Sequence, residues 1–371
     1  MILMQTTIFI ILAGGILVGM HYFFYFSLIR FFSITNPLFK NIFLAVIAFL
    51  GVSFILTSFI ARWWENFFIR ALYFISGFWL GLLGNLIMAA VVVWLIVFVA
   101  QFAGSNANKA ALAAIFFALA LVYSLYGVVN AFNPRIKNIS VSIPNLPEQW
   151  KNKKIVQLSD IHLGLVYRES FMRDIVEKVN SVNSEMVVVT GDYFDGMGDD
   201  LNSLSKPLND IQTEKGVFFV TGNHETYLGV EKALVALEKT KVKILRDEVV
   251  DVDGLKLIGI DYSGQGENKD VPAVIQSLEK YFSGKPNILL YHSPVYLDQF
   301  KKSGVNLQLS GHTHAGQIFP VGYITKLVYK GYDYGLHQIG DFTIYATSGI
   351  GTWGPAMRTG NTPEIVVITL K

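Results

Sequence analysis

Histidine, aspartate and asparagine residues gather at the ends of five short apolar runs in the second half of the chain. The runs are rich in Val, Ile, Leu and Phe, which is typical of buried β-strands. In open α/β folds, ligands collect outside the carboxyl ends of the strands, so polar side chains at those ends can share one site. The residues that follow the five runs are Asp160 and His162, then Asp192, then Asn223, His224 and Glu225, then His292, and finally His312 and His314.

These residue types point to metal binding. Neutral imidazole is the commonest protein ligand for a transition metal, and the chain has no cysteine that could add a thiolate. Nitrogen and oxygen donors without sulfur favour Mn²⁺, Fe²⁺ or Zn²⁺, and we expect Mn²⁺ first. Seven donors exceed one tetrahedral site and suit two adjacent octahedral ions that share a carboxylate. The seven are Asp160, His162, Asp192, Asn223, His292, His312 and His314.

A pair of such ions has a recognisable chemistry. Two metals roughly 3.5–4 Å apart can clamp the attacking and leaving oxygens of a phosphoester displacement and acidify water between them. His224 would then be free to contact a phosphoryl oxygen or to protonate the leaving group. Glu225 is expected to orient a ligand or His224 rather than to bind metal. Arg358 follows the glycine-rich stretch 348–354 and could clamp a phosphate; a surface ion pair is the alternative.

Each of these residues also has an ordinary structural explanation when it is considered alone. Asp192 could cap a turn or a helix. Asn223 could be a turn residue, and His292 could be a hydrogen-bonded loop histidine. Separate turns have no reason to carry metal ligands together, so the joint pattern favours a metal site.

The five motifs together resemble, in order, those of the calcineurin-like metallophosphoesterases. The resemblance covers nearly all of residues 150–371, and the flanking residues look closer still to the bacterial membrane-associated subgroup that includes the phosphoesterase YkuE. Ala315 stands where this subgroup often has glycine. The motifs are Asp160-x-His162, Gly191-Asp192, Gly222-Asn223-His224-Glu225, His292 and Gly311-His312-x-His314.

The resemblance implies a role for each ligand. One metal would take Asp160, His162, Asp192 and His314. The other would take Asp192, Asn223, His292 and His312. Asp192 would be the only ligand shared by both ions.

Residues 1–133 are expected to form a transmembrane helical domain. Apolar segments of spanning length run over residues 7–29, 38–60, 67–100 and 110–129. The third would be about 50 Å long as a helix, against a hydrocarbon core of roughly 30 Å. It could be one tilted helix or two short helices broken near Gly84, and one helix gives four spans. His21 lies inside the first span, where it is either functional or bonded to a neighbouring helix.

The remainder is predicted to form a linker, residues 134–150, which contains one alternating strand (Ile139, Val141 and Ile143), and a catalytic domain, residues 151–371. Strand-like runs alternate with amphipathic helical stretches up to Gly284 and then give way to strands. This pattern predicts an α/β sandwich in which two mixed sheets lie face to face with helices outside. Residues 1–133 carry about +4 and, because the whole chain carries +2, the rest carries about −2. Neither half is basic enough to suggest a nucleic-acid partner.

The sequence thus predicts a membrane-anchored dinuclear phosphoesterase of the bacterial cell membrane. The anchor favours a lipid substrate with a phosphate-bearing headgroup, such as UDP-diacylglucosamine, which resembling enzymes cleave to the lipid monophosphate. The alternatives are an anchored phosphodiesterase or nuclease for soluble nucleotides, and a non-catalytic scaffold, although scaffolds derived from enzymes usually lose ligands. Four basic residues flank the spans on the side of the catalytic domain and three on the other, which favours a cytoplasmic catalytic domain.

Overall fold

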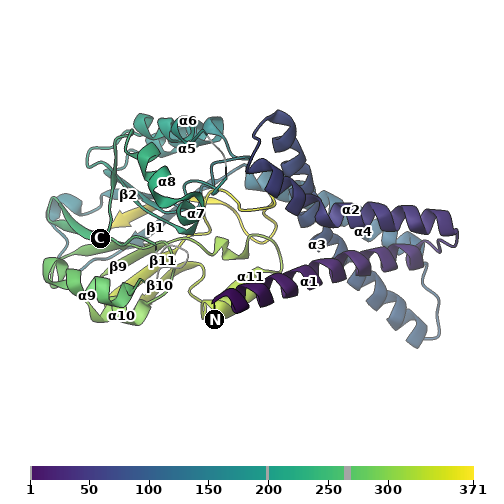
Figure 1. Cartoon of the computed structure of the whole chain (residues 1–371). Helices are drawn as coiled ribbons and strands as arrows, with labels where there is room; N and C mark the ends of the chain where they lie inside the picture. The colour runs from purple at the N-terminus through teal and green to yellow at the C-terminus, as the bar shows by residue number, and fades with distance from the viewer. Residues whose placement is uncertain (1, 198–199, 263–268) are drawn as a thin grey trace. The chain divides into compact units, whose positions relative to one another are not determined.

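The chain divides into two compact units, Met1–Val129 and Asn130–Lys371 (Figure 1). The computed structural model describes residues 2–197, 200–262 and 269–371. The first unit is helical and the second contains all of the strands that the described residues form.

Among the described residues, four helices are long and apolar enough to cross a membrane. The third is a single helix of 36 residues without a break at Gly84, which confirms the prediction of four apolar helices. Three of the helices begin at asparagine caps: Asn36 accepts a hydrogen bond from the Leu38 N–H, Asn66 from the Ile69 N–H, and Asn108 from the Ala111 N–H. The helices are α1 (Ile2–Phe31), α2 (Pro37–Ala61), α3 (Phe67–Phe102) and α4 (Lys109–Ala131).

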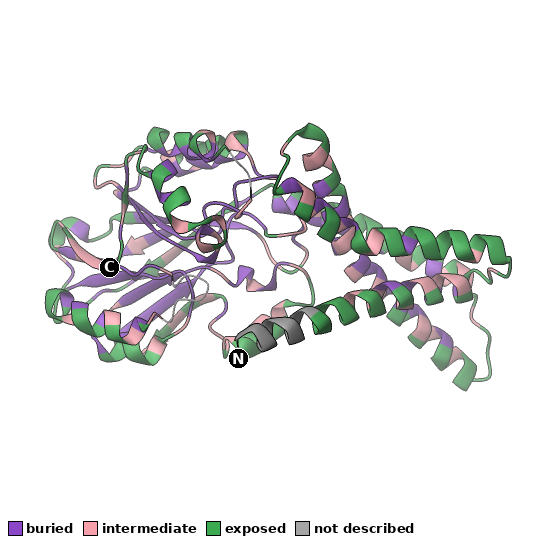
Figure 2. Cartoon of the chain, in the orientation of Figure 1, coloured by how far each residue is buried: buried purple, intermediate pink, exposed green. Residues whose placement is uncertain are grey.

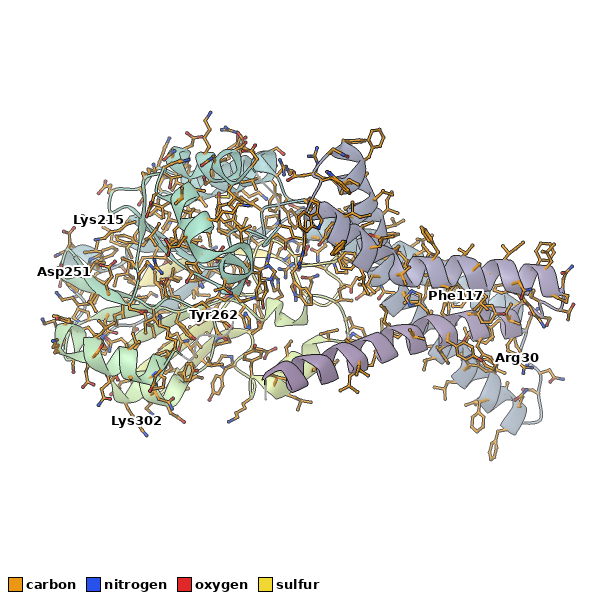
Figure 3. The ribbon with its side chains drawn as sticks, viewed as in Figure 1. Arg30, Phe117, Lys215, Asp251, Tyr262 and Lys302 are labelled. Atoms are coloured by element: carbon orange, nitrogen blue, oxygen red, sulfur yellow. The ribbon has the colours of Figure 1, made fainter. Side chains whose placement is uncertain are left out.

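Polar side chains between these helices pair with one another, and many of the exposed residues of the helices, green in Figure 2, are apolar. The Trp79 indole N–H donates to His21 Nε2 at 3.1 Å, so the structure provides the interhelical partner expected for a structural histidine. Similar bonds join the helices elsewhere, as expected where lipid offers no competing partner. They connect Trp94 with Ser27, Thr57 with Ser76, and Asn85 with Ser124. Most of the side-chain atoms drawn on this unit are carbon atoms. Arg30, in the last turn of α1, is a charged exception (Figure 3).

The second unit is a sandwich of two six-stranded mixed sheets, as the sequence predicts. The first sheet has the order β1 (Arg135–Val141), β12 (Glu364–Leu370), β2 (Lys154–Leu158), β3 (Met186–Thr190), β4 (Val217–Val220) and β5 (Val242–Ile244). The second has the order β10 (Gly335–Ile339), β11 (Phe342–Ala346), β9 (Leu307–Ser310), β8 (Asn287–Leu290), β7 (Leu255–Gly259) and β6 (Glu248–Val252).

Three apolar layers hold the sandwich together. Side chains of the facing sheets, among them Val188 and Leu309, form the central layer. Helices α5 (Glu169–Ser181), α6 (Leu201–Ser205) and α8 (Val230–Leu237) cover the outer face of the first sheet. Helices α9 (Val271–Phe282) and α10 (Leu297–Lys302) cover the second. The central strands are buried on both faces, which explains why their sequences are continuous apolar runs rather than alternating patterns.

Residues 134–150, which the sequence predicts to be a linker, belong to the sandwich. Residues Arg135–Val141 form β1, which pairs in parallel with β12 over seven residues. Ile143, Leu146 and Trp150 then pack into the layer between the sheets. The strand predicted within the linker is present, the segment packs on the sandwich, and the second unit begins at Asn130.

The topology aligns the strand ends that matter for the site. Strands β2, β3 and β4 are parallel neighbours in the first sheet, and β8 and β9 are parallel neighbours in the second. Their carboxyl ends therefore lie at one edge of each sheet, where the loops can converge.

Candidate metal centre

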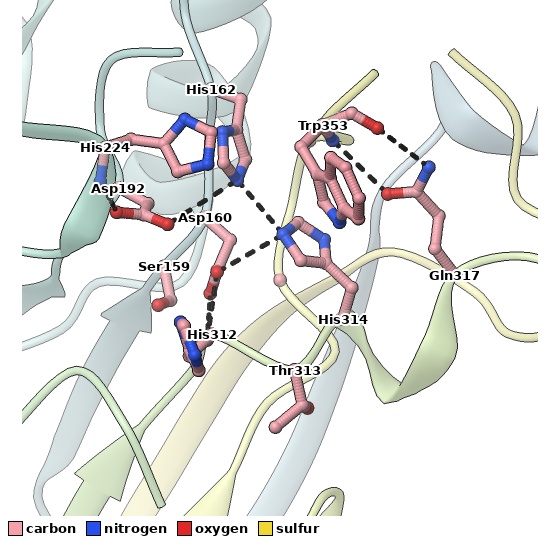
Figure 4. Close-up of polar contacts among 12 residues, drawn as sticks. Ser159, Asp160, His162, Asp192, His224, His312, Thr313, His314, Gln317 and Trp353 are labelled. Carbon is pink, nitrogen blue, oxygen red and sulfur yellow. Dashed lines mark hydrogen bonds and ion pairs between the residues drawn. The ribbon is translucent and has the colours of Figure 1, made fainter. Parts of the chain in front are cut away.

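The loops after β2 and β9 bring together the first group of donors (Figure 4). The Nε2 atoms of His162 and His314 lie 3.0 Å apart. His314 Nε2 is also 3.4 Å from Asp160 Oδ1. All three side chains are buried, and one donor atom from each lies within 4.8 Å of the others.

A second group forms from the loops after β3, β4, β8 and β9. His292 Nε2 lies 3.1 Å from Asp192 Oδ2 and 3.2 Å from His312 Nδ1. Asn223 Oδ1 is 2.8 Å from the same His312 nitrogen and 3.1 Å from His292 Nε2. Four donor atoms from four loops therefore point at one place.

Asp192 lies between the two groups. Its Oδ2 atom is 3.1 Å from His292 Nε2 in the second group and 3.9 Å from His162 Nε2 in the first. Its other oxygen, Oδ1, accepts a hydrogen bond from the His224 backbone N–H at 2.8 Å. The structure thus brings all seven donors predicted from the sequence into two adjoining clusters with a shared carboxylate.

The spacing of the donors fits divalent metal ions. Two imidazole nitrogens that bind one octahedral ion at about 2.1 Å are separated by roughly 3.0 Å across a right angle. The nitrogen pairs His162–His314 and His292–His312 lie at 3.0 and 3.2 Å. Carboxylate and amide oxygens complete both sets, without sulfur. The clusters therefore fit two divalent ions.

Five of the seven donors have a left-handed backbone, which residues other than glycine rarely adopt. The φ angles lie between 50° and 75°, and such conformations concentrate at functional sites. A neighbouring glycine allows the close approach: a Cβ atom at Gly311 would lie 2.0 Å from Asp160 Oδ2. The five residues are Asp160, His162, Asp192, His312 and His314.

Charge and burial set the protonation of the donors. Burial and the nearby His292 lower the pKa of His312 to about 3. Burial, His162 and Arg358 hold the pKa of His314 well below its ordinary value. Burial opposes ionisation of Asp192, but His292 outweighs it and keeps the carboxyl pKa well below 3.8. Burial lowers the pKa of His292, but the Asp192 carboxylate outweighs it and raises that pKa to about 9. Neutral imidazoles and ionised carboxylates are the forms that bind metal, so His292 has to release a proton when a metal binds.

Comparison with known proteins decides the family. The calcineurin-like phosphoesterase profile matches residues 153–316. A metallophosphoesterase of Campylobacter jejuni is 37% identical over 255 residues, which cover 67% of this chain and 67% of the relative. The chain belongs to the calcineurin-like phosphoesterases. A transmembrane protein with a metallophosphoesterase domain from Danio rerio is 34% identical over 67% of this chain and 60% of its own length. Bacillus subtilis YkuE is 28% identical over 61% of this chain and 82% of its own length.

Family and geometry together define the molecule as a membrane-anchored metallophosphoesterase with a site for two metal ions. It is a hydrolase of phosphoester bonds. The segments matched in the first relatives span about two thirds of their length, so the substrate is considered separately below.

Glu225 of this phosphoesterase fixes the loop that carries Asp192. Its side chain is fully buried. Oε2 accepts hydrogen bonds from the backbone N–H groups of Asp192 and Gly222 at 2.9 and 2.7 Å. Oε1 accepts from those of Tyr193 and Phe194 at 2.9 and 3.1 Å. One carboxylate therefore fixes the loop after β3, including the backbone of Asp192.

Asp195 organises two histidines of the phosphoesterase and was not predicted from the sequence. Its carboxylate Oδ1 lies 3.3 Å from His162 Nδ1. Its backbone carbonyl accepts a hydrogen bond from His224 Nδ1 at 2.9 Å. Because His224 donates its Nδ1–H to this carbonyl, Nε2 of the neutral His224 ring carries no proton. The contact of His162 Nδ1 with the carboxylate is an ion-pair distance rather than a hydrogen bond. His162 Nε2 points into the first cluster, and the His224 ring stands 4.5 Å from the His162 ring, almost at a right angle.

A backbone carbonyl also orients His292, because its Nδ1 donates a hydrogen bond to the Thr190 carbonyl at 2.7 Å. Tyr262, also absent from the predictions, lies beside the second cluster, with its ring centre 5.6 Å from that of His292 and 5.9 Å from that of His312 (Figure 3). Burial raises its pKa to about 12, so the phenol is neutral.

Arg358 lies behind His314 rather than at an open surface. Its side chain is 0% exposed. Its Nη2 atom lies 3.1 Å from His314 Nδ1 and donates to the Ser348 carbonyl at 2.7 Å. Nε donates to the Gly351 carbonyl at 3.1 Å, and Nη1 donates to Asn361 Oδ1. The guanidinium is therefore bonded to protein atoms, and the phosphate contact of Arg358 stays a prediction.

Proposed function

We propose that this phosphoesterase hydrolyses a phosphoester or pyrophosphate bond in a lipid-linked substrate, with Mn²⁺ as the preferred metal and with the catalytic unit in the cytoplasm. UDP-diacylglucosamine and other phospholipids with a phosphate-bearing headgroup belong to this class. The single observation that carries the proposal is the pair of donor clusters sharing Asp192, in a chain that also has four helices of membrane-spanning length.

The chain supplies the ligands and the proton donor. One ion would be held by Asp160, His162, Asp192 and His314, and the other by Asp192, Asn223, His292 and His312. When bound, the two ions would lower the pKa of water and neutralise charge on the phosphoryl group. These side chains are buried or nearly so, which keeps the local dielectric constant low and strengthens such interactions.

His224 is the proposed catalytic acid. Its Nδ1–H donates to the Asp195 carbonyl, so protonation occurs at Nε2, and the imidazolium can pass that proton to the leaving oxygen. Its side chain keeps 15% of its surface exposed, whereas six of the seven donors are buried. Glu225 and Arg358 are proposed to act at a distance, by fixing the backbone of Asp192 and the ring of His314.

A substrate screen tests the lipid part of the proposal. Full-length protein in detergent, loaded with Mn²⁺, is given phosphate-bearing lipids and soluble nucleotides in parallel, and the release of phosphate or nucleotide is measured. We expect turnover of a lipid, and its loss in Asp192→Ala. Turnover of soluble nucleotides alone would refute a lipid substrate, and fewer than two Mn²⁺ ions bound per chain would refute the dinuclear site.

A further inference from the structure

A short helix beside the metal centre carries an exposed apolar surface. Helix α11 (Gly322–Val328) begins six residues after Gly316, where the turn that holds His314 ends. Leu327 is 80% exposed, the second highest value among the large apolar side chains of the described residues. We name this the α11 surface; it consists of Phe319, Val321, Tyr323, Ile324, Leu327 and Val328, all of them exposed.

The apolar side chains share one face of the helix. Tyr323, Ile324, Leu327 and Val328 follow the spacing of neighbours on a helix surface. Thr325 points the other way, where its hydroxyl donates to Asp333 Oδ2 at 2.9 Å. Scattered exposed apolar residues are normal, but a contiguous group marks a contact surface.

The charged residues within the segment that carries this face have one sign. Lys326 and Lys330 are exposed, and the sequence from His314 to Tyr332 contains no Asp or Glu. Apolar and aromatic residues flanked by lysine are typical of helices that lie in the interface of an anionic bilayer. A protein partner would leave the lysines without an evident counterpart, whereas phospholipid headgroups supply the opposite charge.

Residues on either side of the α11 surface contact the metal centre and the loop beside it. Tyr329, which follows the helix, lies with its ring 6.2 Å from that of His312. Gln317 joins the start of the segment to the loop of Trp353, because its Oε1 accepts the Trp353 N–H at 3.3 Å and its Nε2 donates to the Pro355 carbonyl at 3.0 Å. Trp353 is itself 56% exposed and stands beside His314 (Figure 4).

The same segment lies close to the residue with which the catalytic unit begins. Asn130, in the last turn of α4, donates to the carbonyls of Arg358 and Asn361 at 3.0 and 2.8 Å. Between these two residues, Thr359 Oγ1 accepts from the Phe319 N–H at 3.2 Å, and the Gly360 N–H donates to the Gln317 carbonyl at 3.0 Å. One stretch of four residues therefore contacts both the end of an apolar, membrane-length helix and the start of the α11 surface.

We propose that the α11 surface lies in the headgroup region of the bilayer and forms the wall along which a lipid headgroup reaches the metal centre. The membrane contact stands on the exposure, charge and position of the helix. The delivery of a lipid rests in addition on the proposed function.

Single-cysteine labelling tests the membrane contact, since the chain contains no cysteine. Nitroxide labels are placed on Leu327→Cys and, as a matched control, on Val235→Cys, an exposed apolar position on α8. Full-length protein is reconstituted in vesicles of phosphatidylethanolamine and phosphatidylglycerol. We expect the label at 327 to collide more often with oxygen than with a water-soluble nickel chelate, and the label at 235 to show the reverse. Equal preference at both positions, or shielding of the label at 327 from both reagents, would overturn the proposal.

A kinetic comparison tests the delivery of lipid. Ile324→Ser with Leu327→Ser should lower kcat/KM for a vesicle-embedded lipid phosphate severalfold and leave turnover of a water-soluble aryl phosphate unchanged, because neither residue touches the donor clusters. An unchanged rate on the lipid would refute delivery along this wall. If the unaltered protein hydrolyses no lipid at all, the proposed substrate class fails, while the labelling still decides the membrane contact.

Discussion

Replacing Asp195 with asparagine should weaken metal binding at one of the two proposed metal sites and leave the other unchanged. The carboxylate lies 3.3 Å from His162 Nδ1, and the side chains of both residues are almost completely buried. Asparagine removes the negative charge and keeps the backbone carbonyl that accepts the hydrogen bond from His224 Nδ1. The substitution therefore weakens the hold on one metal ligand and leaves the proposed catalytic acid in place.

The size of the effect follows from the role of such carboxylates. Loss of a group that orients a ligating histidine typically lowers metal affinity about 10–100-fold, equivalent to about 1.4–2.7 kcal/mol. Only the ion held by Asp160, His162, Asp192 and His314 should be affected. The ligand His292 in the other set is oriented by the Thr190 carbonyl instead, so that affinity should change by less than about twofold.

Calorimetric Mn²⁺ titration of chelator-stripped, full-length Asp195→Asn measures the two affinities separately. Activity should fall at limiting Mn²⁺ and return when Mn²⁺ saturates the weakened site. Asp253→Asn is the control, because that carboxylate is half exposed and pairs with Lys215 at the surface. Equal weakening of both sites, or no weakening of either, would show that Asp195 does not act through His162.

Three further substitutions probe the remaining supports. In Glu225→Gln the side-chain NH₂ faces two backbone N–H donors, so two of the four buried hydrogen bonds are lost, at a cost in stability of about 3–6 kcal/mol. The full-length variant should release bound metal at a lower temperature than Glu231→Gln, a control at an exposed position. Arg358→Lys keeps the positive charge but loses the paired hydrogen bonds to the Ser348 and Gly351 carbonyls. It should lower metal affinity while KM for substrate at saturating metal stays constant. A raised KM with unchanged metal affinity would instead indicate that Arg358 contacts the substrate phosphate. His224→Asn should keep both metals and lower kcat about 10²–10⁴-fold, most of all for substrates with poor leaving groups.

The sequence predicts the strands and the seven donors because both have local signals. Apolar runs of strand length end in residues whose chemistry suits a metal, and parallel topology then brings those ends together. The four apolar helices are predictable for a similar reason, since length and composition decide whether a helix can span a bilayer.

Other features depend on the path of loops, which a local pattern does not contain. Asp195 lies three residues after Asp192 in no periodic segment, and it meets His162 only because the loop after β3 turns back. Arg358 is buried although arginine usually lies at the surface; its partners come from a loop that folds over Asp160. The left-handed backbone at Asp160 and His314 is likewise imposed by surrounding contacts, not by residue type.

The connection to the anchor is shorter than the sequence suggests. A fully flexible segment of 17 residues would have a root-mean-square span of roughly 20–25 Å, but the predicted linker already contains one strand, and in the structure β1 begins four residues after α4 and pairs with β12. Asn130 donates to the Asn361 carbonyl, and the Asn361 amide donates to the His314 carbonyl. Only Asn361 therefore lies between Asn130 and the backbone of His314 in this series of hydrogen bonds.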